Sequence, residues 1–270
     1  MTVEHSRAEN TVYWPFFDLP PLAMVSDDGT IQGVGPDVAE YLQFRLNEYG
    51  HQQFVASPLR IMRSLQEEKH WVATGVFKTP EREEFLCFSK FPCRLTWGLM
   101  AVIRKSDGAV IIQDGQLDPE TVLSSGGYRL GYIRGVHYAG LNPVVDKYGS
   151  NSSVAYASSD LKNQIALLLK GRIDFFFADP LIVYYTSVNN HPVEEIGFAE
   201  CKDSPTDPVL GYFAAPRNEW GRKIISRIDQ ILEEAIRSGD YKYLLNPWVP
   251  EQMRGRFDRD YREKFESLVQ

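Results

Sequence analysis

Short apolar runs alternate with amphipathic segments along most of this chain. In its first third, apolar runs at 12–14, 53–56 and 71–73 are separated by apolar residues at helical spacing over 36–49 and 58–65. The apolar runs predict buried strands, and the helical spacing predicts helices that pack against the core by one face. Strands and helices that alternate in this order predict a parallel sheet with right-handed crossovers.

A second alternating set begins at Tyr128. It predicts strands over 130–133 and 174–178, a helix over 160–170, and another helix from Pro180. The other expected elements are strands over 98–104 and 211–215 and helices over 221–238 and 257–268. The whole pattern predicts an α/β fold.

The segment after the third predicted strand has the clearest candidate chemistry. The strand is expected to end at Thr74 and Gly75. Thr79 is expected to cap a short helical turn that Pro80 begins. Arg82 then lies just beyond the carboxyl end of a strand, where open α/β sheets bind ligands, and its guanidinium suits a carboxylate or phosphate. The alternative is a surface arginine paired with a neighbouring glutamate.

Four motifs stand in order along the chain and together resemble one known family. They are the turn and first helix at 29–39, the stretch 72–92, the strand and glycine turn at 128–135, and the segment 156–179, whose strand ends in aspartate. They are similar to motifs of the family 3 extracellular solute-binding proteins, the polar amino-acid binders of ABC importers. The resemblance extends over roughly 12–248.

This resemblance implies a type II periplasmic-binding-protein fold, in which two α/β lobes are joined by a two-strand hinge. The hinge strands are expected near 96–98 and 209–211. Lobe 1 would then be discontinuous, with residues 10–97 and 210–270, and lobe 2 would comprise residues 98–209. Such proteins bind the ligand in the cleft between the lobes, which closes by a hinge motion.

The resemblance also assigns roles to two charged residues. Arg82 would bind the α-carboxylate of the ligand through two parallel hydrogen bonds. Asp179 would accept a hydrogen bond from the ligand's α-ammonium group. From the sequence alone, Asp179 is equally suited to capping the helix that begins at Pro180, and the two roles can coexist on its two oxygens.

Further contacts are implied on both lobes. Thr74 and Gly75 match positions that supply hydroxyl and backbone contacts, and backbone N–H groups at a strand end beside a helix start favour anions. Gly135 matches the glycine of the anion loop of the second lobe. Arg134 beside it adds positive charge, which would suit a dicarboxylate or another anion.

Three residues bear on the identity of the ligand because the family pattern changes around them. Phe77 stands where a small hydroxyl residue is usual, and Val136 stands where threonine is usual. Phe77 is expected either to stack on a planar ligand or to turn into the core. His137 either replaces the missing donor or is an ordinary surface or core residue. These changes argue against an ordinary polar amino acid as the ligand.

An aromatic cluster near the start of the chain resembles the first-lobe loop that stacks on the ligand. Trp14 is the first candidate for such a contact and Phe17 the second. The alternative is core packing, which explains most aromatic clusters.

Composition narrows the class of protein. The chain has 270 residues, of which 43% are hydrophobic and 24% charged, as in an ordinary globular protein. Its net charge of -7 argues against a nucleic-acid-binding surface, and no apolar run is long enough to span a bilayer. No cofactor or metal is expected, because neither metal-ligand spacing nor a phosphate-binding loop is present.

The cysteines leave one question open. Cys87 and Cys93 would pair only if their Cα atoms lie close together. Three cysteines are an odd number, so at least one thiol is free or pairs between chains.

The start of the chain is polar and lacks the apolar segment of a secretory signal. The protein is therefore either cytoplasmic or a mature chain whose signal has been removed, and the resemblance favours a periplasmic or extracellular location.

The leading functional hypothesis is non-enzymatic binding of a small carboxylate-bearing solute, an amino acid or a related compound, as the receptor for an ABC permease. One alternative is the ligand-sensing domain of a membrane-anchored signalling protein. A less favoured alternative is an enzyme similar to cyclohexadienyl dehydratases, which would need an acid such as Glu194, Glu195 or Glu200.

Overall fold

The computed structural model describes residues 10–26, 28–107, 111–112, 115–187, 193–205 and 208–270. The first nine residues, on which the expectation about a secretory signal depends, lie outside this description.

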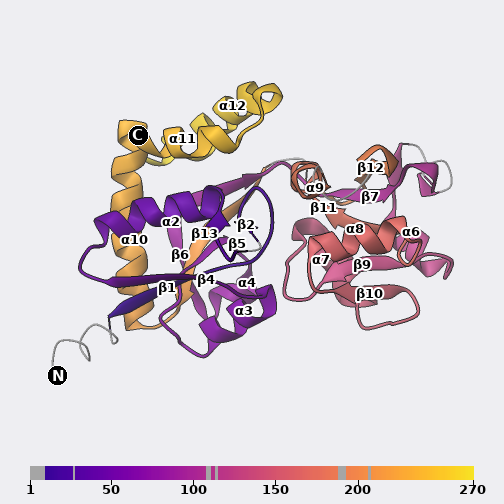
Figure 1. Cartoon of the computed structure of the whole chain (residues 1–270), viewed down its shortest axis with the longest axis horizontal. Helices are drawn as coiled ribbons and strands as arrows, with labels where there is room; N and C mark the ends of the chain where they lie inside the picture. The colour runs from indigo at the N-terminus through magenta and orange to yellow at the C-terminus, as the bar shows by residue number, and fades with distance from the viewer. Residues whose placement is uncertain (1–9, 27, 108–110, 113–114, 188–192, 206–207) are drawn as a thin grey trace. The chain divides into compact units, whose positions relative to one another are not determined.

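The chain divides into two compact units. Unit 1 runs to Leu95 and resumes from Leu210 to Gln270, and unit 2 runs from Thr96 to Val209. Unit 1 therefore contains both the indigo and the yellow ends of the chain, whereas unit 2 is continuous in sequence (Figure 1).

The sheet of unit 1 consists of a two-stranded part and a three-stranded part, which an isolated bridge joins. Its strands are β1 (Thr11–Phe16), β4 (Gly50–Val55), β5 (Ala73–Phe77), β6 (Leu86–Thr96) and β13 (Val209–Pro216), with a small β2–β3 pair (Met24–Val25 and Ile31–Gln32). β1 pairs with β4 in parallel, and Tyr13 of β1 also bridges Trp71, just ahead of β5, in parallel. β13 lies between β5 and β6 and pairs with β5 in the antiparallel direction. The carboxyl ends of β1 and β5 therefore lie at one edge of the sheet.

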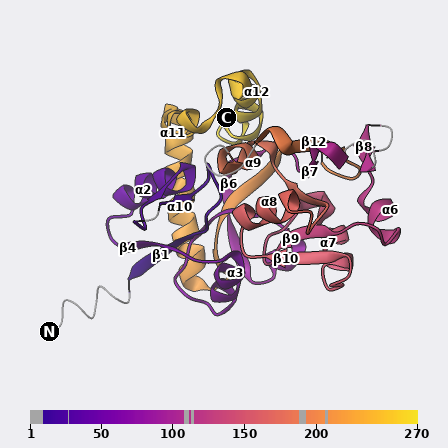
Figure 2. The same ribbon diagram turned by 45° about the vertical axis from the view of Figure 1, so that its right-hand side comes forward.

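Helices cover both faces of this sheet. They are α2 (Val34–Arg45), α3 (Pro58–Gln66), α4 (Pro80–Glu83), α10 (Glu219–Ser238), α11 (Asp240–Leu245) and α12 (Arg254–Lys264). Figures 1 and 2 show α2 on one side of β1 and β4 and α3 on the other. Ile61 and Leu65 of α3 share a buried cluster with Trp71 and Val76. Gly35 lets α2 approach Phe16, because an added Cβ would lie 3.1 Å from its ring.

Unit 2 contains a mixed sheet. Within the described residues, six strands run in the order β10-β9-β11-β7-β12-β8. They are β7 (Met100–Arg104), β8 (Gln116–Leu117), β9 (Leu130–Ile133), β10 (Ala155–Ser158), β11 (Phe175–Ala178) and β12 (Ile196–Cys201). β10, β9 and β11 are parallel to one another, and β7 is antiparallel to β11. The carboxyl ends of β9, β10 and β11 therefore share one edge.

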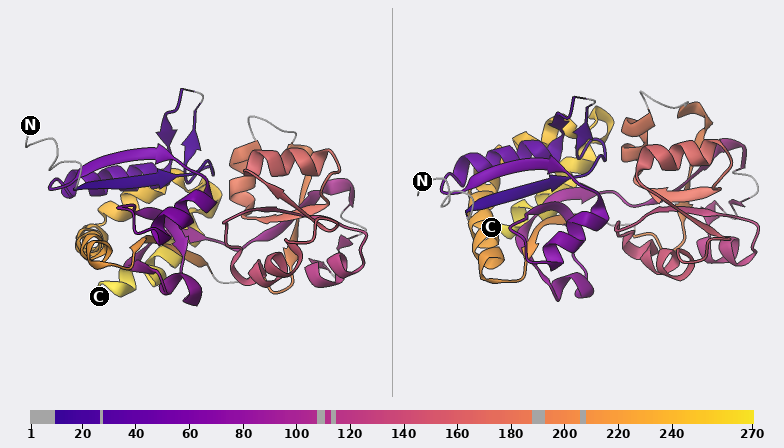
Figure 3. Two further views of the ribbon diagram at one scale, coloured as in Figure 1. Left: turned by 90° about the horizontal axis from the view of Figure 1, so that it is seen from below. Right: turned by 60° about the horizontal axis from the view of Figure 1, so that its bottom comes forward.

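The helices of unit 2 lie on both faces of its sheet (Figure 3). They are α6 (Pro119–Ser124), α7 (Asn142–Tyr148), α8 (Leu161–Leu169) and α9 (Pro180–Ser187). Successive residues of a strand point to opposite faces, so Phe175 and Phe177 pack in one cluster with Val145 of α7. Gly131 of β9 lies on the other face, where an added Cβ would meet Phe176 and Gln164 of α8.

The α/β fold class predicted from the sequence is confirmed, and most elements lie close to their expected positions. Two helices end earlier than predicted, since α12 ends at Lys264 rather than at Leu268 and α2 also stops early. The apolar spacing over 36–49 predicted a helix to Tyr49, but α2 ends at Arg45 and Leu46 is its C-cap residue. Leu46 is still buried, so its side chain belongs to the core without belonging to the helix.

Candidate ligand-binding site

Arg82 lies just beyond the carboxyl end of β5, as the sequence predicted. The Thr79 hydroxyl accepts a hydrogen bond from the Arg82 backbone N–H at 3.3 Å, and this cap begins α4. The Arg82 guanidinium is directed back to the strand, where Nη1 donates to the Phe77 carbonyl oxygen at 3.1 Å. The charge of Glu81 on α4 acts on the same guanidinium, so pairing with a neighbouring glutamate stays an alternative to ligand binding.

Burial sets the electrostatics of this arginine. Desolvation lowers the pKa of the Arg82 guanidinium, and the nearby Glu81 charge raises it. Arg82 uses one N–H group for the bond to the Phe77 carbonyl oxygen, and its planar guanidinium carries further N–H groups. Those groups are suited to a carboxylate or phosphate.

The strand before Arg82 differs from its predicted course. Rather than ending at Thr74 and Gly75, β5 continues through both to Phe77. The Gly75 N–H donates to the Cys93 sulfur at 3.1 Å, so this backbone donor already has a partner within the protein. The strand continues because β13 pairs with it, Gly211 opposite Phe77, and this long-range pairing overrides the local turn signal.

Phe77 remains half-buried at the end of β5 and does not turn fully into the core. Its ring faces the guanidinium of Arg94 on β6, whose Cζ lies 5.5 Å from the ring centroid. Arg94 was missed by the sequence reasoning. No motif marks Arg94 in the sequence. It lies two residues after the stretch 72–92, and this position is all that connects it with the candidate residues.

The two aromatic candidates, one on β1 and one just after it, differ in exposure. Trp14 is fully buried, donates to His51 Nδ1 at 3.2 Å, and packs edge-on against Phe213. Trp14 is thus a core residue, because its ring packs against His51 and Phe213 inside unit 1, and we leave it out of the candidate site. Phe17 is half-buried, lies one residue past the carboxyl end of β1, and packs against the cluster that contains Trp71.

In unit 2, the predicted loop follows β9. Gly135 has a left-handed φ of 84°, which glycine adopts readily. Arg134 is exposed, and Val136 packs partly against the core cluster of this unit. His137 Nδ1 accepts a hydrogen bond from the Ala139 N–H at 3.0 Å, so this histidine helps to shape the loop.

Asp179 follows β11 at the same edge as this loop. Its side chain is only 6% exposed, and Oδ1 accepts from the Leu181 N–H at 2.8 Å. The capping role considered from the sequence is therefore present in the structure. This bond uses Oδ1 of the carboxylate.

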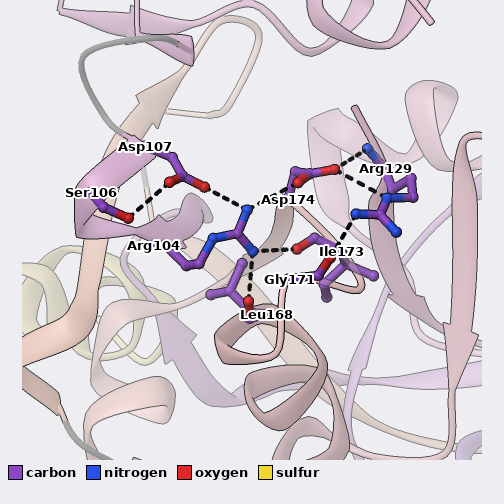
Figure 4. Close-up of polar contacts among 8 residues, drawn as sticks. All are labelled: Arg104, Ser106, Asp107, Arg129, Leu168, Gly171, Ile173 and Asp174. Carbon is purple, nitrogen blue, oxygen red and sulfur yellow. Dashed lines mark hydrogen bonds and ion pairs between the residues drawn. The ribbon is translucent and has the colours of Figure 1, made fainter. Parts of the chain in front are cut away.

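A charged network of unit 2 lies at the opposite ends of these strands (Figure 4). Asp174, just before β11, accepts from Arg104 Nη2 at 3.0 Å and from the Arg129 backbone N–H at 2.8 Å. Arg104 also donates to the carbonyl oxygens of Leu168 and Ile173. These bonds join the start of β9, the start of β11 and the end of β7, so the network stabilises the unit away from the candidate edge.

The structure also bears on the predictions about cysteines, metal sites and membrane-spanning segments. Cys87, Cys93 and Cys201 are free thiols, and burial raises the pKa of the Cys93 thiol to about 12. Cys87 does not bond with Cys93, because both lie on the extended strand β6 with five residues between them, too far apart for a disulfide. The Cys87 sulfur donates to the carbonyl oxygens of Ala215 and Pro216. Within the described part of the chain, no cluster of His, Cys, Asp or Glu has the geometry of a metal site. In the same part, no helix is both long and apolar enough to cross a bilayer.

The sequence matches the family model of the bacterial extracellular solute-binding proteins, family 3, over residues 17–251. The chain belongs to this family. The match spans most of the chain, so it confirms the family that the ordered motifs predicted. No curated protein sequence matches the chain significantly.

Solved structures of solute-binding proteins are similar to this family member in fold. An ancestral arginine-binding protein bound to glutamine has a TM-score of 0.70 and 20% identity, and the match covers 90% of this chain and 99% of that one. An amino-acid ABC transporter substrate-binding protein from Streptococcus pneumoniae, bound to L-arginine, has a TM-score of 0.69 and 17% identity, with 91% and 97% covered. A chain from a structure on glutathione import and the cystine ABC importer of Streptococcus mutans has a TM-score of 0.70 and 15% identity, with 88% and 94% covered. Because these identities are low and the ligands differ, the similarity shows the fold alone.

Proposed function

We propose that this protein is a non-catalytic receptor that binds a small carboxylate-bearing solute and delivers it to an ABC permease from the periplasmic or extracellular side of the membrane. The observation that carries the proposal is the family match over residues 17–251. The family binds solutes, and Arg82 supplies a group for a carboxylate at the strand edge where α/β sheets bind ligands.

In this proposal Arg82 is the principal anchor. A guanidinium binds a carboxylate through two parallel charge-assisted hydrogen bonds, and partial burial strengthens them by excluding water. The bond from Arg82 Nη1 to the Phe77 carbonyl oxygen fixes the direction of the side chain. Preorganisation of this kind lowers the entropy cost of binding.

Unit 2 has candidate contact residues of its own in this proposal. Asp179 would accept from an amine of the solute, and the loop of Arg134, Gly135, Val136 and His137 would contact its other groups. Phe77 and Val136 offer no hydroxyl, so a zwitterion such as glutamine would leave polar groups unpaired, at about 1–3 kcal/mol each. We therefore expect glutamine and histidine to bind weakly.

A thermal-shift screen against carboxylates and amino acids tests the proposal. A solute that binds only the native protein raises the apparent stability by RT ln(1 + [L]/Kd). Arg82→Ala is expected to remove roughly 2–5 kcal/mol of binding free energy for every carboxylate that shifts the wild type, because it leaves the anion unpaired. Calorimetric titration measures this loss.

Arg63→Ala is the matched control. Arg63 lies on α3, its side chain is 79% exposed, and it pairs with Glu67. This variant should bind as the wild type does. A screen without any stabilising carboxylate, or equal affinities for wild type and Arg82→Ala, would contradict the proposal, and turnover of prephenate would contradict a non-catalytic role.

A further inference from the structure

His51 joins two parts of unit 1 through both nitrogens of its ring. Its Nδ1 atom accepts from the indole N–H of Trp14 at 3.2 Å, and its Nε2 atom donates to the Leu46 carbonyl oxygen at 2.9 Å. Val12 of β1 is paired with His51 of β4, and Trp14 lies two residues further along β1, so these side chains share one face of the sheet. The histidine therefore links the end of α2 to the buried face of β1.

These two partners fix the protonation state of the His51 ring. An indole N–H only donates and a carbonyl oxygen only accepts, so Nδ1 carries a lone pair and Nε2 carries the proton. This is the neutral Nε2–H form of the imidazole. Protonation at Nδ1 keeps the bond to Leu46, but it sets an N–H group of His51 against the indole N–H of Trp14.

Trp14 depends on this acceptor. Its side chain is fully buried, and within the described residues its indole N–H has His51 Nδ1 as its hydrogen-bond partner. A buried donor that loses its acceptor destabilises the folded state, because the same donor binds water in the unfolded chain. The indole also packs edge-on against Phe213 of β13, with the ring centroids 6.5 Å apart. The bond to His51 therefore holds a ring on which the packing of β1 against β13 depends.

Several groups act on the charge of the half-buried His51 ring. Burial has the largest effect and lowers its pKa from the ordinary value of 6.5, whereas the Leu46 carbonyl oxygen and the Glu48 charge raise it. Glu48 is itself paired with Arg227 of α10 at 3.2 Å. The last turn of α2 carries one further cation, Arg45. Because burial outweighs the groups that favour a charged ring, the folded protein resists its protonation.

We propose that His51 is a proton-sensitive lock of unit 1, closed while its ring is neutral and opened when Nδ1 takes up a proton. In the closed state, the end of α2, the start of β4 and the buried face of β1 are held together. In the unfolded chain this histidine takes up a proton at about pH 6.5, and in the folded protein it does so only at lower pH. The contribution of the lock to stability is therefore complete above pH 6.5 and is lost as the pH falls below that value.

Urea denaturation of the wild type and of His51→Gln at several pH values tests the proposal. Tryptophan fluorescence follows unit 1, because Trp97 lies in unit 2 and the other tryptophans lie in unit 1. Glutamine has an acceptor and a donor but does not titrate. Relative to the wild type, the folding equilibrium constant of His51→Gln is expected to increase at least fivefold from pH 7.5 to pH 5, which corresponds to about 1 kcal/mol. Parallel stability curves would overturn the proposal.

His70→Gln is the matched comparison. His70 is also half-buried in unit 1, and its ring stacks on Trp220 with the centroids 4.4 Å apart. Stacking accommodates a neutral or a charged imidazole, and within the described residues no hydrogen bond fixes the form of this ring. We therefore expect a smaller change with pH for His70→Gln than for His51→Gln. An equal or larger change would attribute the effect to burial alone and would overturn the role of the two hydrogen bonds.

Nitrogen NMR of the histidine rings in the wild type covers the case in which His51→Gln does not fold. At pH 7.5 we expect His51 in the Nε2–H form, and we expect the indole N–H signal of Trp14 to change as His51 titrates. A ring protonated at Nδ1 at pH 7.5, or a His51 pKa at or above the ordinary value of 6.5, would overturn the proposal. So would an indole signal that stays constant while His51 titrates.

Discussion

At the scale of single residues, Asp179 has one role in the structure and one in the proposal. Its Oδ1 caps α9 by accepting from the Leu181 N–H. The proposed ligand contact would use the carboxylate charge, whereas the cap needs only an acceptor oxygen. Asparagine supplies such an oxygen and is itself a good capping residue, so one substitution separates the two roles.

We expect Asp179→Asn to weaken L-glutamate by roughly 1.5–3 kcal/mol, the value of a hydrogen bond to a charged group, and to spare glutarate, which lacks the amine. Calorimetry with both ligands and a thermal melt of the same variant measure the two effects. Asp118→Asn is the control, because Asp118 caps α6 by accepting from the Thr121 N–H. Equal effects on the two ligands, or none, would show that Asp179 makes no amine contact.

At the scale of elements, the charged network around Asp174 stabilises three strand ends away from the candidate site (Figure 4). Its carboxylate accepts bonds from Arg104 and Arg129 in a largely buried position. Asp174→Asn is expected to lower the free energy of unfolding by about 1.5–3 kcal/mol without changing solute affinity. Urea denaturation and calorimetry measure both quantities, with the more exposed Asp107→Asn as the milder comparison. A changed affinity would mean that the two edges of unit 2 are coupled.

Another element-scale prediction concerns Asp229 of α10. Burial raises the pKa of this carboxyl to about 6, although its Oδ1 accepts from the Lys90 N–H at 2.7 Å. The folded protein therefore holds this proton more tightly than the unfolded chain, whose carboxyl has the ordinary value of 3.8. The resulting stabilisation is present below that value and is lost as the pH rises through about 6.

Asp229→Asn cannot ionise, so its stability relative to the wild type should increase between pH 4 and pH 7. Urea denaturation at several pH values measures this difference. Glu233→Gln on the exposed face of the same helix is the control, since Glu233 pairs with Arg237 in solvent. Parallel stability curves for the wild type and Asp229→Asn would contradict the raised pKa.

The sequence predicted these elements well where local signals and tertiary pairing agree. The strand over 130–133 and the helix from Pro180 follow from apolar runs and a proline at a first helical position. The sequence-based predictions failed at Gly75, where pairing with β13 extends the strand, and at Trp14, whose ring packs against Phe213 in the core. Arg94 could not be found from local sequence, because its contact with Phe77 depends on three strands brought together by the fold.

At the scale of the whole molecule, the chain passes twice between two units, each with its own sheet and buried core. Candidate residues lie at the carboxyl edge of the parallel strands in each unit, Phe17 and Arg82 in unit 1 and Gly135 and Asp179 in unit 2. This placement agrees with the rule for ligand sites in α/β sheets and with membership of a solute-binding family.

The most direct test of the receptor proposal is a crystal structure of the protein with the carboxylate that stabilises it most in the thermal-shift screen. We predict that one carboxylate of the solute accepts two parallel hydrogen bonds from the Arg82 guanidinium, at about 2.7–2.9 Å. A solute bound elsewhere, with the guanidinium in contact only with the Phe77 carbonyl oxygen, would contradict the account.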